Sequence, residues 1–129
     1  MRSLIMSNVM IRLKRAYEPA DPRDGRRFLV DRLWPRGVRK EDLTVDGWLK
    51  TLAPSSELRR WYGHAPDRWG EFAARYGAEL DRGSQEFQRL LAAARAGDVT
   101  LLTAARDLEH SNAAALKRFL EQALDGPAS

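Results

Sequence analysis

The chain has 129 residues, of which 43% are hydrophobic and 31% are charged, so it fits one globular domain and excludes a disordered or membrane-spanning chain. It contains no cysteine, which excludes disulfides and thiolate metal sites and is typical of a protein of the reducing cytoplasm. Its 22 lysines and arginines against 18 acidic residues give a net charge of +4, which permits anion binding without requiring it.

Two strands are predicted in the first third of the chain. Apolar Val9, Ile11 and Leu13 alternate with other residues, and this period of two predicts a first strand. A second strand is predicted over residues 27–33, after a connection that is short for a crossover between parallel strands. The two strands therefore either pair antiparallel or are joined by a compact turn. Residues 41–50, which are broken by Gly47, predict a loosely periodic helical segment.

The rest of the chain predicts four helices and one strand. The helices are expected to start and end at capping residues or prolines: Ser55 to Gly63, Pro66 to Gly83, Ser84 to Gly97, and a last helix that Asp107 caps. Residues 99–103 predict a strand before the last helix. The predicted class is α/β, a small three-layer-like domain with a short mixed or parallel sheet of about three strands, packed by several helices, with helix exceeding strand. We expect this domain to span residues 9–124, with flexible ends at 1–8 and 125–129.

One cluster of polar side chains follows the second strand at residues 31–37, where the sequence reads Asp-Arg-Leu-Trp-Pro-Arg-Gly. Open α/β sheets place their binding crevice at such strand ends, and arginine offers a planar fork of donors that suits phosphate or carboxylate. Asp31 is either a general base or one half of a structural salt bridge. Arg32 is either a clamp for an anionic ligand or, likewise, one half of a structural salt bridge. Arg36 lies on a loop stiffened by its neighbours, which favours contact with a ligand. Trp34 either stacks on a ligand ring or closes the edge of the core.

This cluster and several later motifs carry a family resemblance. The later motifs are residues 53–55 with 57–59, 61–64, 75–76 with 79–80, 100–102 with 104–107, and His110. In this order they resemble the YeaO-like branch of the domain of unknown function 488 family, over residues 9–120. The resemblance implies a small bacterial α/β protein without an established activity. The sequence at 109–112 departs from many relatives, and a cysteine mechanism cannot be transferred to a chain that has no cysteine.

The other candidate site residues lie at two helix ends. His64 either exchanges protons or binds the last carbonyl groups of its helix. Arg106, Asp107 and His110 form the counterpart of the first cluster at the end of the third strand. The candidate catalytic residues are Asp31, His64 and His110, and the candidate ligand-binding residues are Arg32, Trp34, Arg36, Arg106 and Asp107. With two histidines and none of the standard nucleotide-loop or zinc motifs, we expect no metal and no cofactor.

Three functions remain open from the sequence. The first is a cytoplasmic protein that binds a small anionic or phosphate-bearing ligand at an arginine-rich strand-end pocket. If this protein is an enzyme, that ligand is its substrate. The second is a nucleic-acid-binding module that uses residues 23–40, which hold seven basic and two acidic residues. The third is a structural or partner-binding protein. No membrane partner is expected, and the sequence decides neither catalysis nor the oligomeric state.

Overall fold

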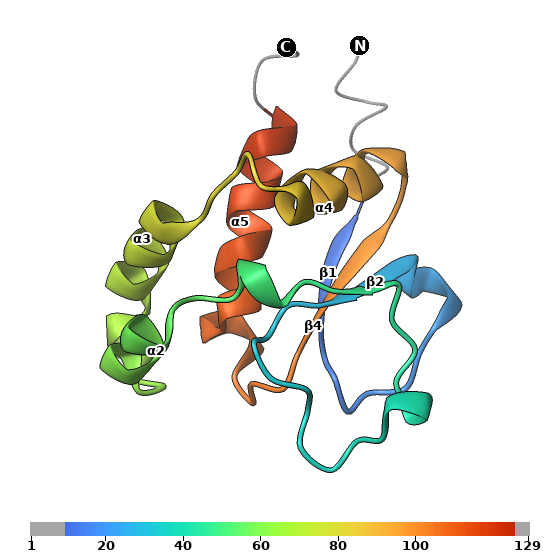
Figure 1. Cartoon of the computed structure of the whole chain (residues 1–129), viewed down its shortest axis with the longest axis horizontal. Helices are drawn as coiled ribbons and strands as arrows, with labels where there is room; N and C mark the ends of the chain where they lie inside the picture. The colour runs from blue at the N-terminus through green and yellow to red at the C-terminus, as the bar shows by residue number, and fades with distance from the viewer. Residues whose placement is uncertain (1–9, 126–129) are drawn as a thin grey trace.

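Four parallel strands form a single sheet in the computed structural model, which describes residues 10–125 (Figure 1). In chain order they are β1 (Ile11–Arg15), β2 (Arg26–Leu29), β3 (Gly47–Trp48) and β4 (Val99–Thr103). The predicted α/β class is confirmed, and helix exceeds strand. The ends predicted to be flexible lie outside the described residues, except for Asp125, the last residue of the last helix.

The strand order is β1-β4-β2-β3, so β1 and β2 flank β4 and do not pair with each other. Both Ile11 of β1 and Arg26 of β2 lie opposite Val99. Of the two alternatives for these strands, antiparallel pairing is therefore wrong. The physical reason lies in β4, whose five side chains are all buried, because a strand that is apolar on both faces is stable only between two neighbours.

The helix predicted over residues 41–50 is also wrong. This segment forms the 3₁₀ turns η2 (Lys40–Asp42) and η3 (Lys50–Leu52) around the short strand β3. Gly47 lies close to the Phe28 ring and the Arg89 guanidinium, where an added Cβ would meet atoms at 3.1 Å. Contacts with β2 and with a later helix therefore overrode a weak local periodicity.

The helices follow the predicted order, and their first turns show which side chains cap them. They are α2 (Ser56–Tyr62), α3 (Trp69–Glu79), α4 (Gln85–Ala96) and α5 (Asn112–Asp125). The Ser55 and Ser84 side chains accept hydrogen bonds from the third residue of α2 and α4, as predicted. The capping role predicted for Asp107 is wrong, because a 3₁₀ turn, η5 (Leu108–His110), precedes α5, and Ser111 accepts from the Ala114 N–H instead.

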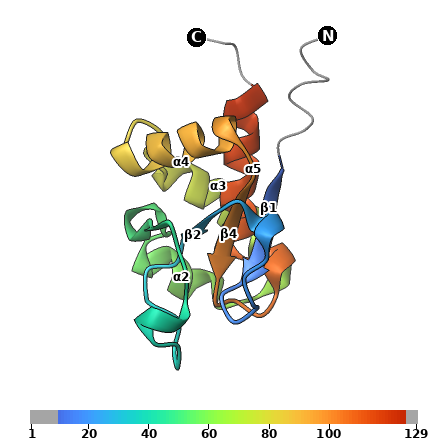
Figure 2. The ribbon, with the colours of Figure 1, turned by 90° about the vertical axis from the view of Figure 1, so that its right-hand side faces the viewer.

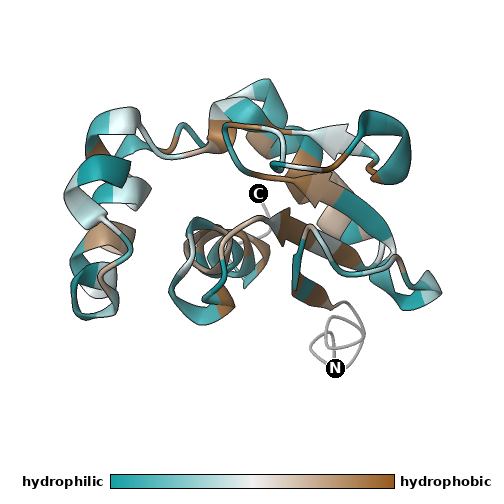
Figure 3. Ribbon diagram, turned by 90° about the horizontal axis from the view of Figure 1, so that it is seen from below, coloured by the Kyte–Doolittle hydropathy of each residue, from teal (hydrophilic) through white to brown (hydrophobic). Residues whose placement is uncertain are grey.

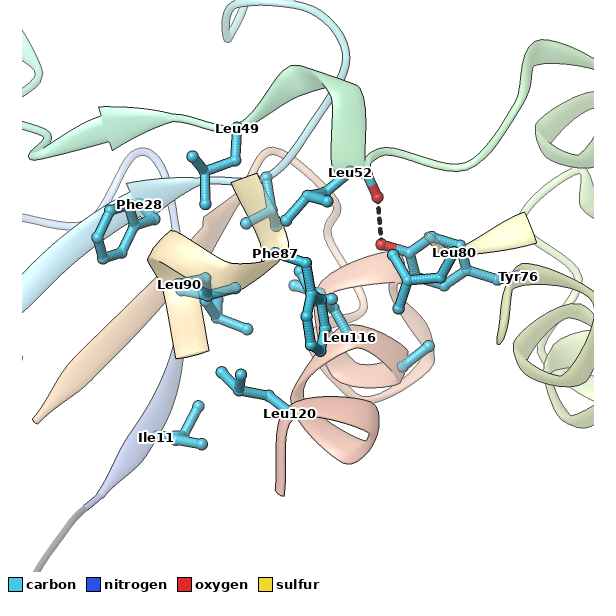
Figure 4. Close-up of a cluster of buried hydrophobic side chains, with 14 of the residues drawn as sticks. Ile11, Phe28, Leu49, Leu52, Tyr76, Leu80, Phe87, Leu90, Leu116 and Leu120 are labelled. Carbon is cyan, nitrogen blue, oxygen red and sulfur yellow. Dashed lines mark hydrogen bonds between the residues drawn. The ribbon is translucent and has the colours of Figure 1, made fainter. Parts of the chain in front are cut away.

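The main core lies between the sheet and the helices. Helix α5 packs beside β1 and β4, and α3 packs on α5 (Figures 1 and 2). Phe28, Leu90 and Leu116 meet in this core, and the buried Tyr76 hydroxyl donates a hydrogen bond to the Leu52 carbonyl (Figure 4). Burial raises the pKa of Tyr76, so this hydroxyl stays protonated as a donor. In Figure 3 hydrophobic residues gather in the strands near the centre of the molecule, with hydrophilic residues among them, and the outer helices are largely hydrophilic.

The other face of the sheet carries a buried ionic cluster of Lys14, Asp24 and Arg27. Asp24 accepts hydrogen bonds from the Lys14 ammonium at 3.0 Å and from the Arg27 guanidinium, and its side chain is only 3% exposed. Burial opposes the charge on Asp24, but the hydrogen bonds from Lys14, Asp21 and Arg27 outweigh it and lower the pKa of this carboxyl group. The cluster thereby fixes the compact turn that joins β1 to β2.

Candidate functional site

A cavity of about 700 Å³ opens at the carboxyl ends of the strands. Its lining comes from the loop after β2 (residues 31–36), from α2 and the turn before it, and from the connection between β4 and α5. In Figure 1 these segments lie together below the sheet, with α2 on the left and the loop after β2 at the bottom. This volume is within the range of pockets for small ligands, about 300–1,000 Å³.

The loop after β2 forms one wall and is held in place by its own tryptophan. The Trp34 indole N–H donates to the Val38 carbonyl at 2.7 Å, and its ring packs edge-on against Trp48, with centroids 5.4 Å apart. Between Trp34 and Val38 the chain turns at Gly37, whose φ of +82° is a conformation that favours glycine. Because the loop is braced from inside, Arg32 and Arg36 are displayed with exposed side chains at the cavity.

Asp31 lies at the base of this loop and acts as a brace between strands. Its carboxylate accepts hydrogen bonds from the Thr103 hydroxyl at 2.8 Å, the Ala104 N–H at 2.8 Å and the Asn112 side-chain amide at 3.2 Å. These three donors belong to the end of β4, the following residue and the first residue of α5. One carboxylate therefore ties the ends of β2 and β4 to α5, at the floor of the cavity.

Helix α2 forms the opposite wall. Arg59 and Arg60 lie next to each other on it, are both exposed, and both line the cavity. The helix ends at Gly63, which has a left-handed conformation, and the next residue, His64, also has a positive φ of 56°. A left-handed histidine is uncommon and slightly strained, and here it places the imidazole at the rim of the cavity.

Replacing Ser55 with alanine should destabilise the protein by about 1 kcal/mol, the usual cost of a lost helix cap. The Ser55 hydroxyl caps α2 and also donates to the Glu79 carboxylate at 2.6 Å, so the change loosens α2 at both contacts. Ser84→Ala is the matched control, because it removes a similar cap from α4, away from the cavity. Urea denaturation measures both losses. Hydrogen exchange should show extra opening of α2 only for Ser55→Ala, and equal protection of α2 in both variants would contradict this role.

The third side of the cavity carries an Asp–His pair. The Asp107 carboxylate lies 2.7 Å from His110 Nδ1, and this hydrogen bond holds the pKa of Asp107 below its usual value. The Tyr62 hydroxyl donates to the His110 backbone carbonyl at 2.6 Å. Burial, with the nearby carboxylates of Asp107 and Asp67, raises the pKa of Tyr62. When Nδ1–H donates to Asp107, Nε2 of a neutral His110 is left as a hydrogen-bond acceptor.

The charges around the cavity are unbalanced. Arg32, Arg36, Arg59 and Arg60 all line it, and within residues 10–125 none of them lies within 4.0 Å of a carboxylate oxygen. The two lining carboxylates are engaged elsewhere, Asp31 by its three donors and Asp107 by His110. Four arginines with exposed side chains therefore line the cavity, and their guanidinium groups carry hydrogen-bond donors suited to an anion. Arg59 uses one of its donors on the Ser56 hydroxyl of its own helix.

Most of the residues that the sequence singled out come together here. Seven of the eight line the cavity, namely Asp31, Arg32, Trp34, Arg36, His64, Asp107 and His110, whereas Arg106 does not. Arg59, Arg60 and Tyr17 also line the cavity but are not among the site residues predicted from the sequence. Arg59 did leave a signal: no acidic residue stands three or four positions from it, so its charge is not neutralised within its own helix.

Residues 10–125 contain no group of three or more histidine, aspartate or glutamate side chains arranged to hold a metal ion. None of the helices in the same residues is both long enough and apolar enough to cross a lipid bilayer.

Comparison with known proteins agrees with the motifs. The family model described as the inactive DUF488-N3 subclade matches residues 10–128. The chain belongs to the DUF488 family. Among its DUF488 relatives, the uncharacterized protein Rv3073c of Mycobacterium tuberculosis is 47% identical over 110 residues, which cover 85% of this chain and 92% of that one. The uncharacterized protein YeaO of Escherichia coli is 43% identical over 111 residues, covering 85% and 96%. No solved structure matches the chain.

Proposed function

We propose that this DUF488 protein binds a small anionic ligand, with a phosphate as the anionic group, in the cavity at the strand ends. The observation that carries the proposal is the set of four arginines on two walls of one cavity, which lack carboxylate partners among the described residues. Bidentate guanidinium–phosphate pairs are among the strongest hydrogen bonds that proteins make.

The ligand also has an apolar part. Ala53 and Leu33 line the cavity with accessible apolar surface, and Leu33 has 68% of its surface exposed. A large apolar side chain so exposed at a cavity rim gains from covering by a ligand. An inorganic anion alone would leave this apolar surface uncovered.

Binding without a reaction fits the cavity better than catalysis. Asp31 is engaged as a brace, because its carboxylate accepts three hydrogen bonds and these use three of about four lone-pair positions. Nε2 of His110 remains an acceptor for a ligand hydroxyl or amine, and His64 and His110 are the candidate proton carriers of the enzyme version of this proposal. The description of the matching subclade as inactive agrees with a binding role.

The nucleic-acid alternative has less support, because the basic stretch at residues 23–40 does not act as one positive surface. Arg23 pairs with Asp21, Arg27 is buried against Asp24, and Arg39 pairs with Asp42. Three of the seven positive charges are therefore neutralised locally, and Arg32 and Arg36 line the cavity. A surface that follows phosphates along a strand needs charges that remain free over its length.

Hexyl phosphate should raise the thermal unfolding midpoint in proportion to its binding, by mass action on the folded state. Sodium chloride at the same ionic strength is the reference, and differential scanning fluorimetry measures the unfolding midpoint in both solutions. Arg32→Ala with Arg59→Ala, one from each wall, should weaken binding by at least about tenfold, because the phosphate loses a charged hydrogen bond at whichever wall it occupies. The matched control is Arg26→Ala with Arg95→Ala, which removes two exposed arginines outside the cavity and should leave the shift unchanged.

Two results would contradict the proposal. The first is a shift that the control pair abolishes as fully as the cavity pair does, because the charge effect would then be general. The second is micromolar binding of unrelated labelled oligonucleotides, steeply weakened by salt, which Arg36→Ala with Arg39→Ala removes. Fluorescence anisotropy at low and high salt measures the second, and we expect only weak binding.

A further inference from the structure

We infer that the ligand carries two anionic groups, joined by an apolar or aromatic body, with one group for each wall of the cavity. This inference rests on the proposed function and goes further, because it specifies the class of ligand. The loop pair, Arg32 and Arg36, and the helix pair, Arg59 and Arg60, are the two recognition elements.

The two pairs are held by separate supports, which keep them on their own walls. The loop pair depends on the Trp34–Val38 hydrogen bond and on the Tyr17 hydroxyl, which donates to the Arg36 carbonyl at 3.2 Å. The helix pair depends on the Ser55 cap and the Glu79 contact below it. The loop and the helix are fixed by different contacts, so each arginine pair projects from its own element of the cavity lining.

The cavity is much larger than a single small anion. Liquid water occupies about 30 Å³ per molecule, so a cavity of about 700 Å³ has room for far more than one phosphate group. One phosphate bound at the loop pair would leave the helix pair without a partner. Two phosphates at opposite ends of one molecule match both pairs and cover the apolar lining between them.

The rest of the cavity lining is compatible with an uncharged linker that joins the two anionic groups of the ligand. Leu33 and the half-buried Ala53 present apolar surface to the cavity, and the Tyr62 hydroxyl already donates to the His110 carbonyl. The acidic groups of this region, Asp31 and Asp107, are both bonded to other residues. An uncharged linker therefore fits the middle, and charge is best placed at the ends.

Isothermal titration calorimetry with two matched probes tests the inference. Hexyl phosphate and hexamethylene bisphosphate share a six-carbon body and differ in the second phosphate. We expect the bisphosphate to bind one-to-one and at least about tenfold tighter, because the second group makes its own charged hydrogen bonds. Arg59→Ala with Arg60→Ala, or Arg32→Ala with Arg36→Ala, should reduce this preference to less than about threefold. The Arg26→Ala and Arg95→Ala control should keep it.

The outcomes separate this inference from the proposed function. If both probes bind with equal affinity and either double change abolishes both, one anion bridges the two walls; the inference is then overturned and the proposed function stands. If the bisphosphate binds more tightly but neither pair matters to the preference, the second phosphate binds elsewhere, and the inference is overturned as well. If neither probe binds to the wild-type protein, both proposals fail.

Discussion

Replacing Asp24 with asparagine should lower the free energy of unfolding by about 3–5 kcal/mol, the cost of breaking a buried ion pair from one side. The change leaves the Lys14 ammonium and the Arg27 guanidinium without their carboxylate, in places where their side chains are only 16% and 6% exposed. It also disturbs the turn before β2, because the Asp24 carboxylate accepts a hydrogen bond from the Asp21 N–H. Urea denaturation followed by circular dichroism measures the loss.

Asp42→Asn is the matched control, since it breaks the ion pair with Arg39 at a site where both side chains are more than half exposed. Exposed pairs contribute up to about 1 kcal/mol, so the control should lose far less than Asp24→Asn. Equal losses in the two variants would show that the cluster of Lys14, Asp24 and Arg27 does not stabilise the fold as a buried ionic cluster.

The Asp24 effect should also depend on pH in a defined direction. The pKa of this carboxyl group is lowered in the folded protein from its usual value of 3.8, so the folded state favours the charged form. Its contribution is complete above pH 3.8 and is lost as the pH falls through the lowered folded value. The difference in stability between wild type and Asp24→Asn should therefore be constant near neutral pH and shrink in acid. A difference that grows in acid would have the wrong sign.

Replacing Asp31 with alanine should cost about 3 kcal/mol, because it removes the acceptor of three hydrogen bonds at the cavity floor. The donors of these bonds are the Thr103 hydroxyl, the Ala104 N–H and the Asn112 amide. The loss should appear in urea denaturation without any ligand. Asp107→Ala is the control from the same cavity, and its loss should be smaller, since that carboxylate is half exposed and bonds one side chain.

A second reading of the same Asp31 variant separates a brace from a catalytic base. Removing a structural residue destabilises the protein even without a ligand, whereas removing a catalytic base leaves its stability unchanged. If Asp31→Ala unfolds at the same urea concentration as wild type, the three hydrogen bonds add nothing to the fold and the structural interpretation of Asp31 is wrong.

The sequence predicted those elements whose stability is local. Strand β4 was predicted at its observed bounds, because a run of five apolar or β-branched residues between Gly97 and Ala104 leaves few alternatives. The caps at Ser55 and Ser84 were predicted from the same local chemistry. The sheet order was not, because β1 and β2 take their places from contacts with β4, far along the chain. Strand β3 was missed for a related reason, since its two residues are ordered by pairing with Phe28 and Leu29.

The candidate site shows the same difference between residues that local sequence predicts and residues that long-range packing brings together. The run at residues 31–37 stands out because charged and aromatic side chains crowd behind a buried strand, and residues 31–36 of it line the cavity. Arg59 and Arg60 were missed because, within α2, they have the pattern of any solvated helix face. Only the packing of α2 across from the loop after β2 brings the two arginine pairs to one cavity. No local pattern encodes that approach.

The central place of β4 also bears on how the chain is made and folds. Because β1 and β2 reach each other only through β4, the sheet cannot assemble until residues 99–103 have left the ribosome. Pairings such as Ile11 with Val99 give the fold a high contact order, which slows folding. During synthesis, β2 (residues 26–29) has one unpaired edge until β4 emerges, which leaves Phe28 and Leu29 exposed and prone to aggregation. We expect a fragment that stops before residue 99 to aggregate, because it contains two strands that have no partner between them.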